Sequence, residues 1–204
     1  MRRQELEEYD YQPLFWIAES FHEGMRVVAD IGGSVGIKFY AFSKYTRFPE
    51  SVLWRVIDVP AAVPLGRELA RKNNAEERLL FSDRLSDADG CDVMLCLGSL
   101  QFLPQTLAQL VGSLEQRPAQ IVVNTTPIHE TRSFFTLHSM GTAICPYRVS
   151  NRNAFLEDMA KLGYRVRHSW LNPNKDMTLP FHDGFDVQHF SGFCFERRDT
   201  STWQ

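Results

Sequence analysis

The chain has 204 residues, of which 44% are hydrophobic and 12% aromatic, and its formal net charge is −3. This length suits one domain (1–204) with a substantial core, and the apolar content excludes a disordered chain. The charge balance and the lack of a basic run give no electrostatic footprint for nucleic acid. No stretch reaches the roughly 20 apolar residues of a membrane span, and the charged first residues lack the apolar core of a signal peptide. We therefore expect a cytoplasmic protein with neither a nucleic-acid nor a membrane partner.

The cysteines form no Cys-x-x-Cys pair; they are Cys91, Cys96, Cys145 and Cys194. We expect reduced core thiols of an intracellular protein. The segment from His182 to His189 carries further metal-capable side chains, but their spacing matches no known zinc pattern. We therefore predict no metal site.

An amphipathic helix is predicted over residues 10–24, because its apolar side chains recur at near-helical spacing and Gly24 follows. This N-terminal segment (1–24) has two interpretations. Its aromatic side chains can belong to the core, or they can cover a ligand cleft. The candidates for a cover are Tyr9, Tyr11 and Trp16.

The most informative stretch is Val27–Gly36, a β-branched run that ends in Asp30 and a glycine-rich turn before a predicted helix at Ile37–Tyr45. A strand, a glycine turn and a helix N-terminus together offer free backbone N–H groups to a polar ligand. A dinucleotide fingerprint, G-x-G-x-x-G with an acid about 20 residues later, does not fit the glycine spacing. The acid instead stands two residues before the first glycine, as in the pattern D/E-x-G-x-G-x-G. Its positions are Asp30, Gly32, Ser34 and Gly36, with Ser34 in place of a glycine beside Gly33.

A second strand, Val52–Ile57, ends at Asp58. An ionised carboxylate there can accept both hydroxyls of a ribose. The alternative is that Asp58 caps the helix predicted over 61–73. A short third strand at Leu79–Ser82 is followed by Asp83, either a binding residue or a solvated turn aspartate.

A near-continuous apolar run at Cys91–Leu97 predicts a buried central parallel strand. Gly98, Ser99 and Gln101 follow it, and Pro104 is expected at the first position of a helix over 105–116. The fifth strand is Gln120–Asn124. Strict alternation of strands and helices to this point requires a parallel, doubly wound sheet.

The C-terminal part departs from that alternation. A helix is predicted at Asn151–Leu162, then a strand at Tyr164–Leu171, a long loop at Asn172–Gln188 and a strand at His189–Arg197. Two closing strands without a helix between them indicate that the last strand is antiparallel.

Taken together, roughly residues 10–198 resemble class I S-adenosylmethionine-dependent methyltransferases. More narrowly, they resemble a family of bacterial proteins regarded as methyltransferases and often associated with surface-polysaccharide loci. The matching segments are Asp30-x-Gly-Gly, Trp54-Arg-Val-Ile-Asp-Val-Pro60, Asn124-Thr-Thr-Pro-Ile, Phe135-Thr-Leu-His, Cys145-Pro-Tyr-Arg and Asn151-Arg152. The resemblance implies an α/β, Rossmann-like doubly wound sheet of order 3-2-1-4-5-7-6, strand 7 antiparallel, in a three-layer α/β/α arrangement.

The implied cofactor is S-adenosyl-L-methionine, and the implied substrate is a small molecule with a polar acceptor such as a sugar-like hydroxyl or a carboxylate. Asp83 then falls at an adenine-contacting position, and the loop after the fourth strand lies along the methionine part. The expected cofactor-binding residues are Asp30, Gly32, Gly33, Ser34, Gly36, Asp58, Val59, Asp83, Gly98 and Ser99.

The acceptor side is expected at Gln101 and in residues 125–150, a substrate-side insertion. His129, after the fifth strand, is the first candidate for a general base, and His138 the second. Cationic and phenolic groups that can hold an anionic acceptor are Arg132, Tyr147 and Arg148. An NAD(P)-dependent oxidoreductase and a catalytically silent partner-binding module remain the alternatives. The oligomeric state is open, a homodimer being one expectation.

Overall fold

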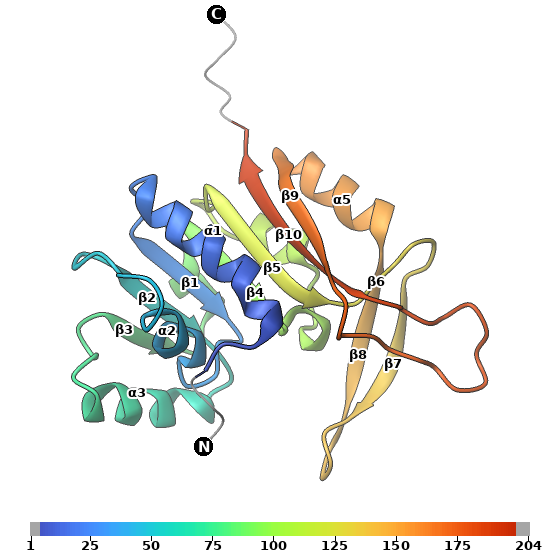
Figure 1. Cartoon of the computed structure of the whole chain (residues 1–204), viewed down its shortest axis with the longest axis horizontal. Coiled ribbons are helices and arrows are strands. Elements are labelled where there is room, and N and C mark those ends of the chain that lie inside the picture. Colours follow the sequence, from blue (N-terminus) through green and yellow to red (C-terminus); the bar gives the residue numbers. More distant parts are fainter. Residues whose placement is uncertain (1–4, 199–204) are drawn as a thin grey trace, which may run out of the picture.

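The computed structural model describes residues 5–198, so the first four residues of the N-terminal segment lie outside it. A seven-stranded sheet has the order β3-β2-β1-β4-β5-β10-β9 (Figure 1). Its strands are β1 (Val27–Ile31), β2 (Leu53–Ile57), β3 (Leu79–Ser82), β4 (Val93–Leu97), β5 (Gln120–Thr126), β9 (Tyr164–Asn172) and β10 (Phe190–Arg197). Strands β1 to β5 pair in parallel, whereas β10 is antiparallel to both β5 and β9. The predicted fold class and strand order are confirmed.

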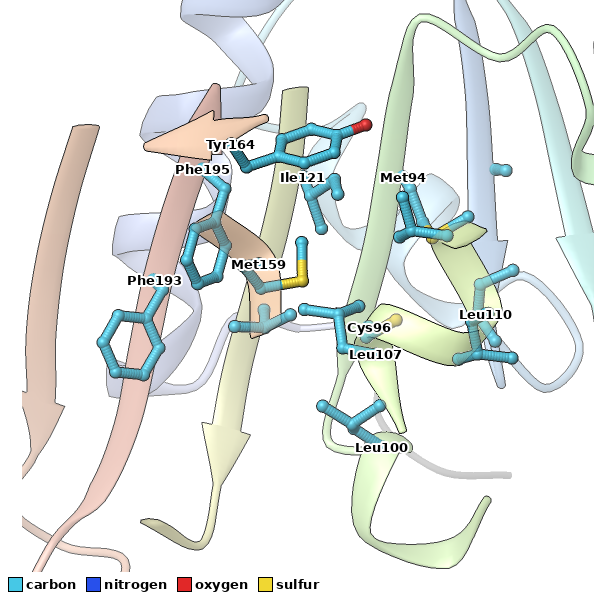
Figure 2. Packing of buried hydrophobic residues seen from close by; sticks show 14 of the residues in the cluster. Met94, Cys96, Leu100, Leu107, Leu110, Ile121, Met159, Tyr164, Phe193 and Phe195 are labelled. Atoms are coloured by element: carbon cyan, nitrogen blue, oxygen red, sulfur yellow. The ribbon is translucent and has the colours of Figure 1, made fainter. Parts of the chain in front are cut away.

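Helices cover both faces of this sheet. One face carries α1 (Tyr11–His22), α2 (Ile37–Phe42) and α3 (Ala62–Lys72), and the other carries the short helix η2 (Leu85–Ala88), α4 (Leu107–Gly112) and α5 (Arg152–Lys161). Accordingly, the core divides into two clusters. Trp54 belongs to the cluster under α1 and α2, and Met159 to the cluster under α4 and α5, which Figure 2 shows. The predicted three layers are therefore present.

The central strand β4 is buried at Val93, Met94, Leu95 and Cys96, all with 0% exposure. A parallel strand covered on both faces has no solvent side, so its apolar run is continuous rather than alternating. Each such side chain removes apolar surface from water and contributes roughly 1.5–3 kcal/mol. This burial fixes the position of the loops that leave the carboxyl ends of the strands.

The bounds of two helices differ from the sequence prediction, and one of them, α4, also ends at Gly112, short of the predicted residue 116. Pro104 does not begin a helix: a short helix η3 (Leu100–Phe102) precedes it, and α4 starts at Leu107. The Thr106 hydroxyl accepts from the backbone N–H of Gln109, while the Gln109 side chain accepts from the N–H of Thr106. This capping box overrides the proline signal. Similarly, α2 ends at Phe42, short of the predicted Tyr45.

Residues 125–150 build a second, three-stranded sheet that the sequence analysis left unassigned. Its strands are β6 (Ile128–His129), β7 (Phe134–Ser139) and β8 (Ile144–Asn151), in the order β6-β8-β7. Figure 1 shows β7 and β8, called the arm below, standing apart from the main sheet on the side where β1 and β5 end. The inner face of the arm packs its buried Tyr147 and Val149 with Val187 and Phe190.

All four cysteines are free thiols. Cys91, Cys96 and Cys194 are buried in the core, and burial raises the pKa of Cys91 and of Cys194 to about 12. Cys145 is only half-buried, on β8, so the expectation of a core thiol is wrong for this residue. Within residues 5–198, no helix has the length and apolar character to cross a bilayer, and no three His, Cys, Asp or Glu side chains gather as metal ligands would.

Candidate cofactor and acceptor site

Asp30 stands at the end of β1 with only 1% of its surface exposed. The indole N–H of Trp54, on the neighbouring strand, donates to its Oδ2 at 3.2 Å. Burial raises the pKa of Asp30 to about 7, against lowering by Trp54 and by the positive charge of Lys38. Ionising a carboxyl group that is buried this deeply costs free energy. The Trp54 N–H and the positive charge of Lys38 offset part of that cost.

The glycine turn after Asp30 has no room for a side chain at Gly32 or Gly33. A Cβ added to Gly33 would lie 2.4 Å from Asp30 Oδ2, and one added to Gly32, at φ 74°, would lie 2.3 Å from Ser99 Cβ. Ser34 itself adopts a left-handed conformation at φ 57°, which a serine tolerates at some cost. The turn therefore accommodates Ser34 in a glycine position of the pattern, because the close approach to Asp30 falls on Gly33.

Asp58 follows β2 and faces the same turn. Its Oδ2 accepts from the backbone N–H of Ser34 and its Oδ1 from the N–H of Val59, both at 2.7 Å. The alternative of a helix cap is wrong, because α3 begins at Ala62 with Ala61 as its N-cap. Asp58 therefore joins the turn after β1 to the end of β2. We call Asp30–Gly36, Asp58 and Ser99 the cradle.

The loop after β4 lies against the cradle. The buried Ser99 hydroxyl donates to the carbonyl of Ile31, and Gln101 Nε2 donates to the carbonyl of Gly98 at 3.0 Å. Gln101 is 6% exposed, and its Oε1 has no hydrogen-bond partner. By contrast, the side chains of Val59 (62% exposed) and Asp83 lie at the surface beyond β2 and β3.

The N-terminal segment reaches the cradle through the short helix η1 (Glu8–Asp10). Buried Asp10 pairs with Lys38 of α2 at 2.5 Å, and the Tyr9 ring lies 4.6 Å from Lys175 Nζ. Of the other aromatic candidates for a cover, Trp16 is buried in the core and Tyr11 is exposed. Tyr9 is thus the candidate that is neither buried in the core nor fully turned to solvent, and its carbonyl accepts from Asn124 of β5.

Asn124, at the end of β5, is a residue whose role sequence reasoning missed. Its Nδ2 donates to the carbonyl of Tyr9 at 2.6 Å, and its Oδ1 accepts from Trp170 Nε1 at 2.9 Å and Asn172 Nδ2 at 3.0 Å. One side chain therefore ties the N-terminal segment to β5 and β9. The available signal was a buried amide in an otherwise apolar strand, since such a group requires partners.

Both ring nitrogens of His129 have backbone partners. Nδ1 accepts from the N–H groups of Thr131 and Arg132 at 3.0 and 3.1 Å, and Nε2 lies 3.0 Å from the carbonyl of Gly184. This arrangement requires an unprotonated Nδ1 and a proton on Nε2. No lone pair remains to accept a proton from a substrate. The geometry therefore favours a structural role for His129, joining β6 to the loop before β10, rather than a role as general base.

His138 lies on β7, with its ring stacked on Tyr147 at 5.1 Å and edge-on to Phe102 at 5.5 Å. Burial raises the pKa of Tyr147 to about 12, partly offset by a hydrogen bond from Gln101. Tyr147 therefore stays a neutral phenol. Through Phe102 and Gln101, these rings lie against the loop that follows β4.

The two arginines singled out from the sequence diverge. Arg132 lies over the Phe185 ring at 4.4 Å. Arg148 lies over the Phe135 ring at 5.1 Å and donates from Nη2 to the carbonyl of Pro104, whereas its Nη1 is buried without a partner. Arg148 lines a pocket beside the loop after β4, and Arg132 is not part of that lining.

That pocket has a volume of about 80 Å³ and lies between the loop after β4, the arm, α4 and α5. We call it the α4–α5 pocket. Its lining includes Gln101 and Arg148 together with apolar Leu100, Leu107 and Phe155. Because Gln101 belongs to the same loop as Ser99, the pocket adjoins the cradle.

No family model matches this sequence, and no curated protein sequence does. Solved structures do match in three dimensions. The mitomycin 7-O-methyltransferase MmcR is 17% identical with a TM-score of 0.57, and the match covers 93% of this chain and 54% of MmcR. The chain thus spans about half the length of that protein.

Two further structures contain S-adenosylhomocysteine. The N-terminal domain of EvdMO1 is 12% identical with a TM-score of 0.63, covering 95% of this chain and 83% of that one. The 1,6-didemethyltoxoflavin-N1-methyltransferase of Burkholderia thailandensis is 19% identical with a TM-score of 0.56, covering 92% and 78%. At these identities the likeness concerns architecture. The chain has the fold of S-adenosylmethionine-dependent small-molecule methyltransferases.

Proposed function

We propose that this protein is an S-adenosylmethionine-dependent methyltransferase that acts on a small polar acceptor. The observation that carries the proposal is the cradle. The backbone of Gly33 lies close to the Asp30 carboxyl, and Asp58 accepts a hydrogen bond from the N–H of Ser34. The turn therefore presents main chain rather than side chains to the ligand. Backbone approach and carboxylates at two adjacent strand ends suit a nucleoside ligand.

In this proposal Asp58 accepts the ribose hydroxyls, while Asp30 lies near the positively charged sulfonium end. Gly98 and Ser99 border the methionine part, and Asp83 lies on the adenine side. Tyr9, fixed by Asn124 and flanked by Lys38 and Lys175, supplies the cover from the N-terminal segment. When bound, S-adenosylmethionine supplies an activated methyl group, and the chain positions it.

The acceptor enters beside Gln101. Methyl transfer is an in-line displacement, so alignment of the accepting lone pair contributes most of the catalysis. Of the two histidines proposed as bases, His138 has the more suitable place, because its ring stands in the aromatic wall formed with Phe102 and Tyr147. Arg148 and Gln101 supply polar contacts to the acceptor.

Two rival functions make different predictions. An NAD(P)-dependent oxidoreductase would bind NADH at the same edge. A silent partner-binding module would bind no nucleoside. It would not need the Asp58 carboxylate in a fixed position at the end of β2.

Calorimetric titration of the purified protein with S-adenosylmethionine, S-adenosylhomocysteine and NADH decides among them. We expect micromolar binding of the first two and none of the third. Binding of NADH alone would support the oxidoreductase, and binding of none would support the partner-binding module.

A further inference from the structure

The α4–α5 pocket holds two buried polar atoms without partners, Gln101 Oε1 and Arg148 Nη1. One is a hydrogen-bond acceptor and the other a charged donor. Unpaired buried polar groups are rare in folded proteins, because each forfeits its hydration without compensation. Here one unpaired acceptor and one unpaired donor lie in the lining of the same pocket, which suggests a ligand that forms hydrogen bonds with both.

Neither side chain is free to turn elsewhere. Gln101 Nε2 donates to the carbonyl of Gly98 at 3.0 Å and also lies against the Tyr147 hydroxyl, which leaves Oε1 as the atom to be satisfied. Arg148 is held by the carbonyl of Pro104 and by the Phe135 ring. A guanidinium fixed in this way is pre-organised, so little side-chain entropy is lost when an anion binds.

Three further polar side chains of the lining, those of Thr106, Ser133 and Asn151, are already engaged. Thr106 caps α4, the Ser133 hydroxyl accepts from the N–H of Asn151, and Asn151 Oδ1 accepts from the N–H of Ala154. Asp158 also lines the pocket, but it pairs with Lys161 at 2.9 Å and is 48% exposed. Its charge is therefore balanced and screened, and the positive charge of Arg148 dominates the buried part.

We propose that the α4–α5 pocket binds the carboxylate end of a hydroxy acid, with Arg148 donating to the carboxylate and Gln101 Oε1 accepting from the adjacent hydroxyl. The pocket is small, with a volume of about 80 Å³, and its apolar Leu100, Leu107 and Phe155 can contact the carbon atoms of the ligand. This inference rests on the proposed function, since it places the hydroxy acid on the acceptor side, next to the cradle.

The test uses the full chain saturated with S-adenosylhomocysteine and three probes in ligand-detected NMR titrations: lactate, propionate and propane-1,2-diol. Lactate offers both groups, propionate lacks the hydroxyl, and the diol lacks the charge. We expect affinities in that order, with lactate about ten- to a hundredfold tighter than the diol, since a hydrogen bond to a charged group is worth that ratio.

Two variants locate the effect. Arg148→Gln should reduce lactate binding to the level of the diol, and Arg148→Lys should restore part of it. The matched control is Arg152→Gln, which removes an arginine stacked on Phe193 at 5.5 Å but outside the pocket lining, and it should leave lactate binding unchanged.

Equal affinities for lactate and the diol, no binding of any probe, or unaltered lactate binding in Arg148→Gln would each overturn the proposal. Tighter binding of inorganic phosphate than of lactate would overturn the assignment to a carboxylate. Affinity for S-adenosylhomocysteine is measured separately in every variant. Its absence in the unaltered protein would contradict the proposed function, and the three probes would then be titrated against the free protein.

Discussion

The cradle and the acceptor side are built in opposite ways. In the cradle nearly every polar group has a partner: Trp54 holds Asp30, and Asp58 holds the N–H groups of Ser34 and Val59. On the acceptor side Gln101 and Arg148 each leave a buried atom unpaired, and the outer face of the arm exposes Phe135 and Leu137 at 65% and 70%.

The difference separates a part of the chain that is tightly constrained from a part that is free to vary. A cradle whose members constrain one another tolerates few substitutions. An arm that hangs from the end of β5 can change its side chains without disturbing the main sheet. Substitutions in the cradle should therefore have larger effects than a substitution that loosens the arm.

The largest expected effect is a pH dependence of stability that comes from Asp30. Burial raises its folded-state pKa from 3.8 to about 7, so the folded protein keeps this proton to a higher pH than the unfolded chain. The resulting stabilisation is complete below about pH 4 and is lost as the pH rises through about 7, a change on the order of 4 kcal/mol. Urea unfolding at pH 5 and pH 8 should show somewhat more than half of this change, and Asp30→Asn should remove most of the difference. Equal pH slopes in the two proteins would contradict this account.

Gly33→Ala should damage the cradle next most strongly. Its Cβ would lie 2.4 Å from Asp30 Oδ2, and overpacking of this kind costs about 1–3 kcal/mol. Affinity for S-adenosylhomocysteine should fall by roughly a hundredfold as the turn shifts. The control is Gly112→Ala, where the nearest atom, in Leu162, is 3.9 Å away. Equal calorimetric affinities in both variants would show that the turn does not contact the cofactor.

Asp58→Ala should weaken S-adenosylhomocysteine binding by about ten- to a hundredfold with the fold retained, because charge-assisted hydrogen bonds are lost. Asp92→Ala is a matched control: Asp92 also accepts two backbone N–H bonds, from Arg26 and Val27 at 2.7 and 2.8 Å, at the opposite end of β1. Both variants should lose stability, but only the first should lose affinity. Unchanged affinity in Asp58→Ala would exclude its ribose role.

The smallest expected effect is that of His129→Asn, a substitution outside the cradle that tests the acceptor side. Losing the bond to Gly184 should lower the free energy of unfolding by about 1 kcal/mol and leave S-adenosylhomocysteine affinity within about twofold. Once an acceptor is known, KM should change more than kcat. A fall in kcat on the order of a hundredfold, with loss of the alkaline plateau in the pH profile, would instead identify His129 as the general base.

The main sheet was predictable from the sequence because buried parallel strands leave a direct signal. The apolar run of β4, the carboxylates Asp30 and Asp58 and the glycine turn mark strands and strand ends without any tertiary information. The missing helix between β9 and β10 indicated the antiparallel strand. The start of α4 was predicted wrongly at Pro104, although the capping-box spacing of Thr106 and Gln109 marks it.

The arm and the acceptor side were not predictable in the same way. Residues 134–139 alternate, but their apolar Phe135 and Leu137 point to solvent, so the pattern does not report a core. The partners of His129 and the unpaired atoms of Gln101 and Arg148 depend on chain segments that come together only on folding. Residue type suggested these side chains as candidates, and geometry distinguished them.

The most direct test of the central claim is to map S-adenosylhomocysteine binding residue by residue with backbone amide NMR. The account predicts that the amide signals of Gly32, Ser34, Val59 and Ser99 shift on titration. Signals at the opposite end of the sheet, such as those of Gly90 and Gln116, should stay in place. Shifts confined to the opposite end or to the arm, or no shifts at all, would contradict a cofactor site in the cradle.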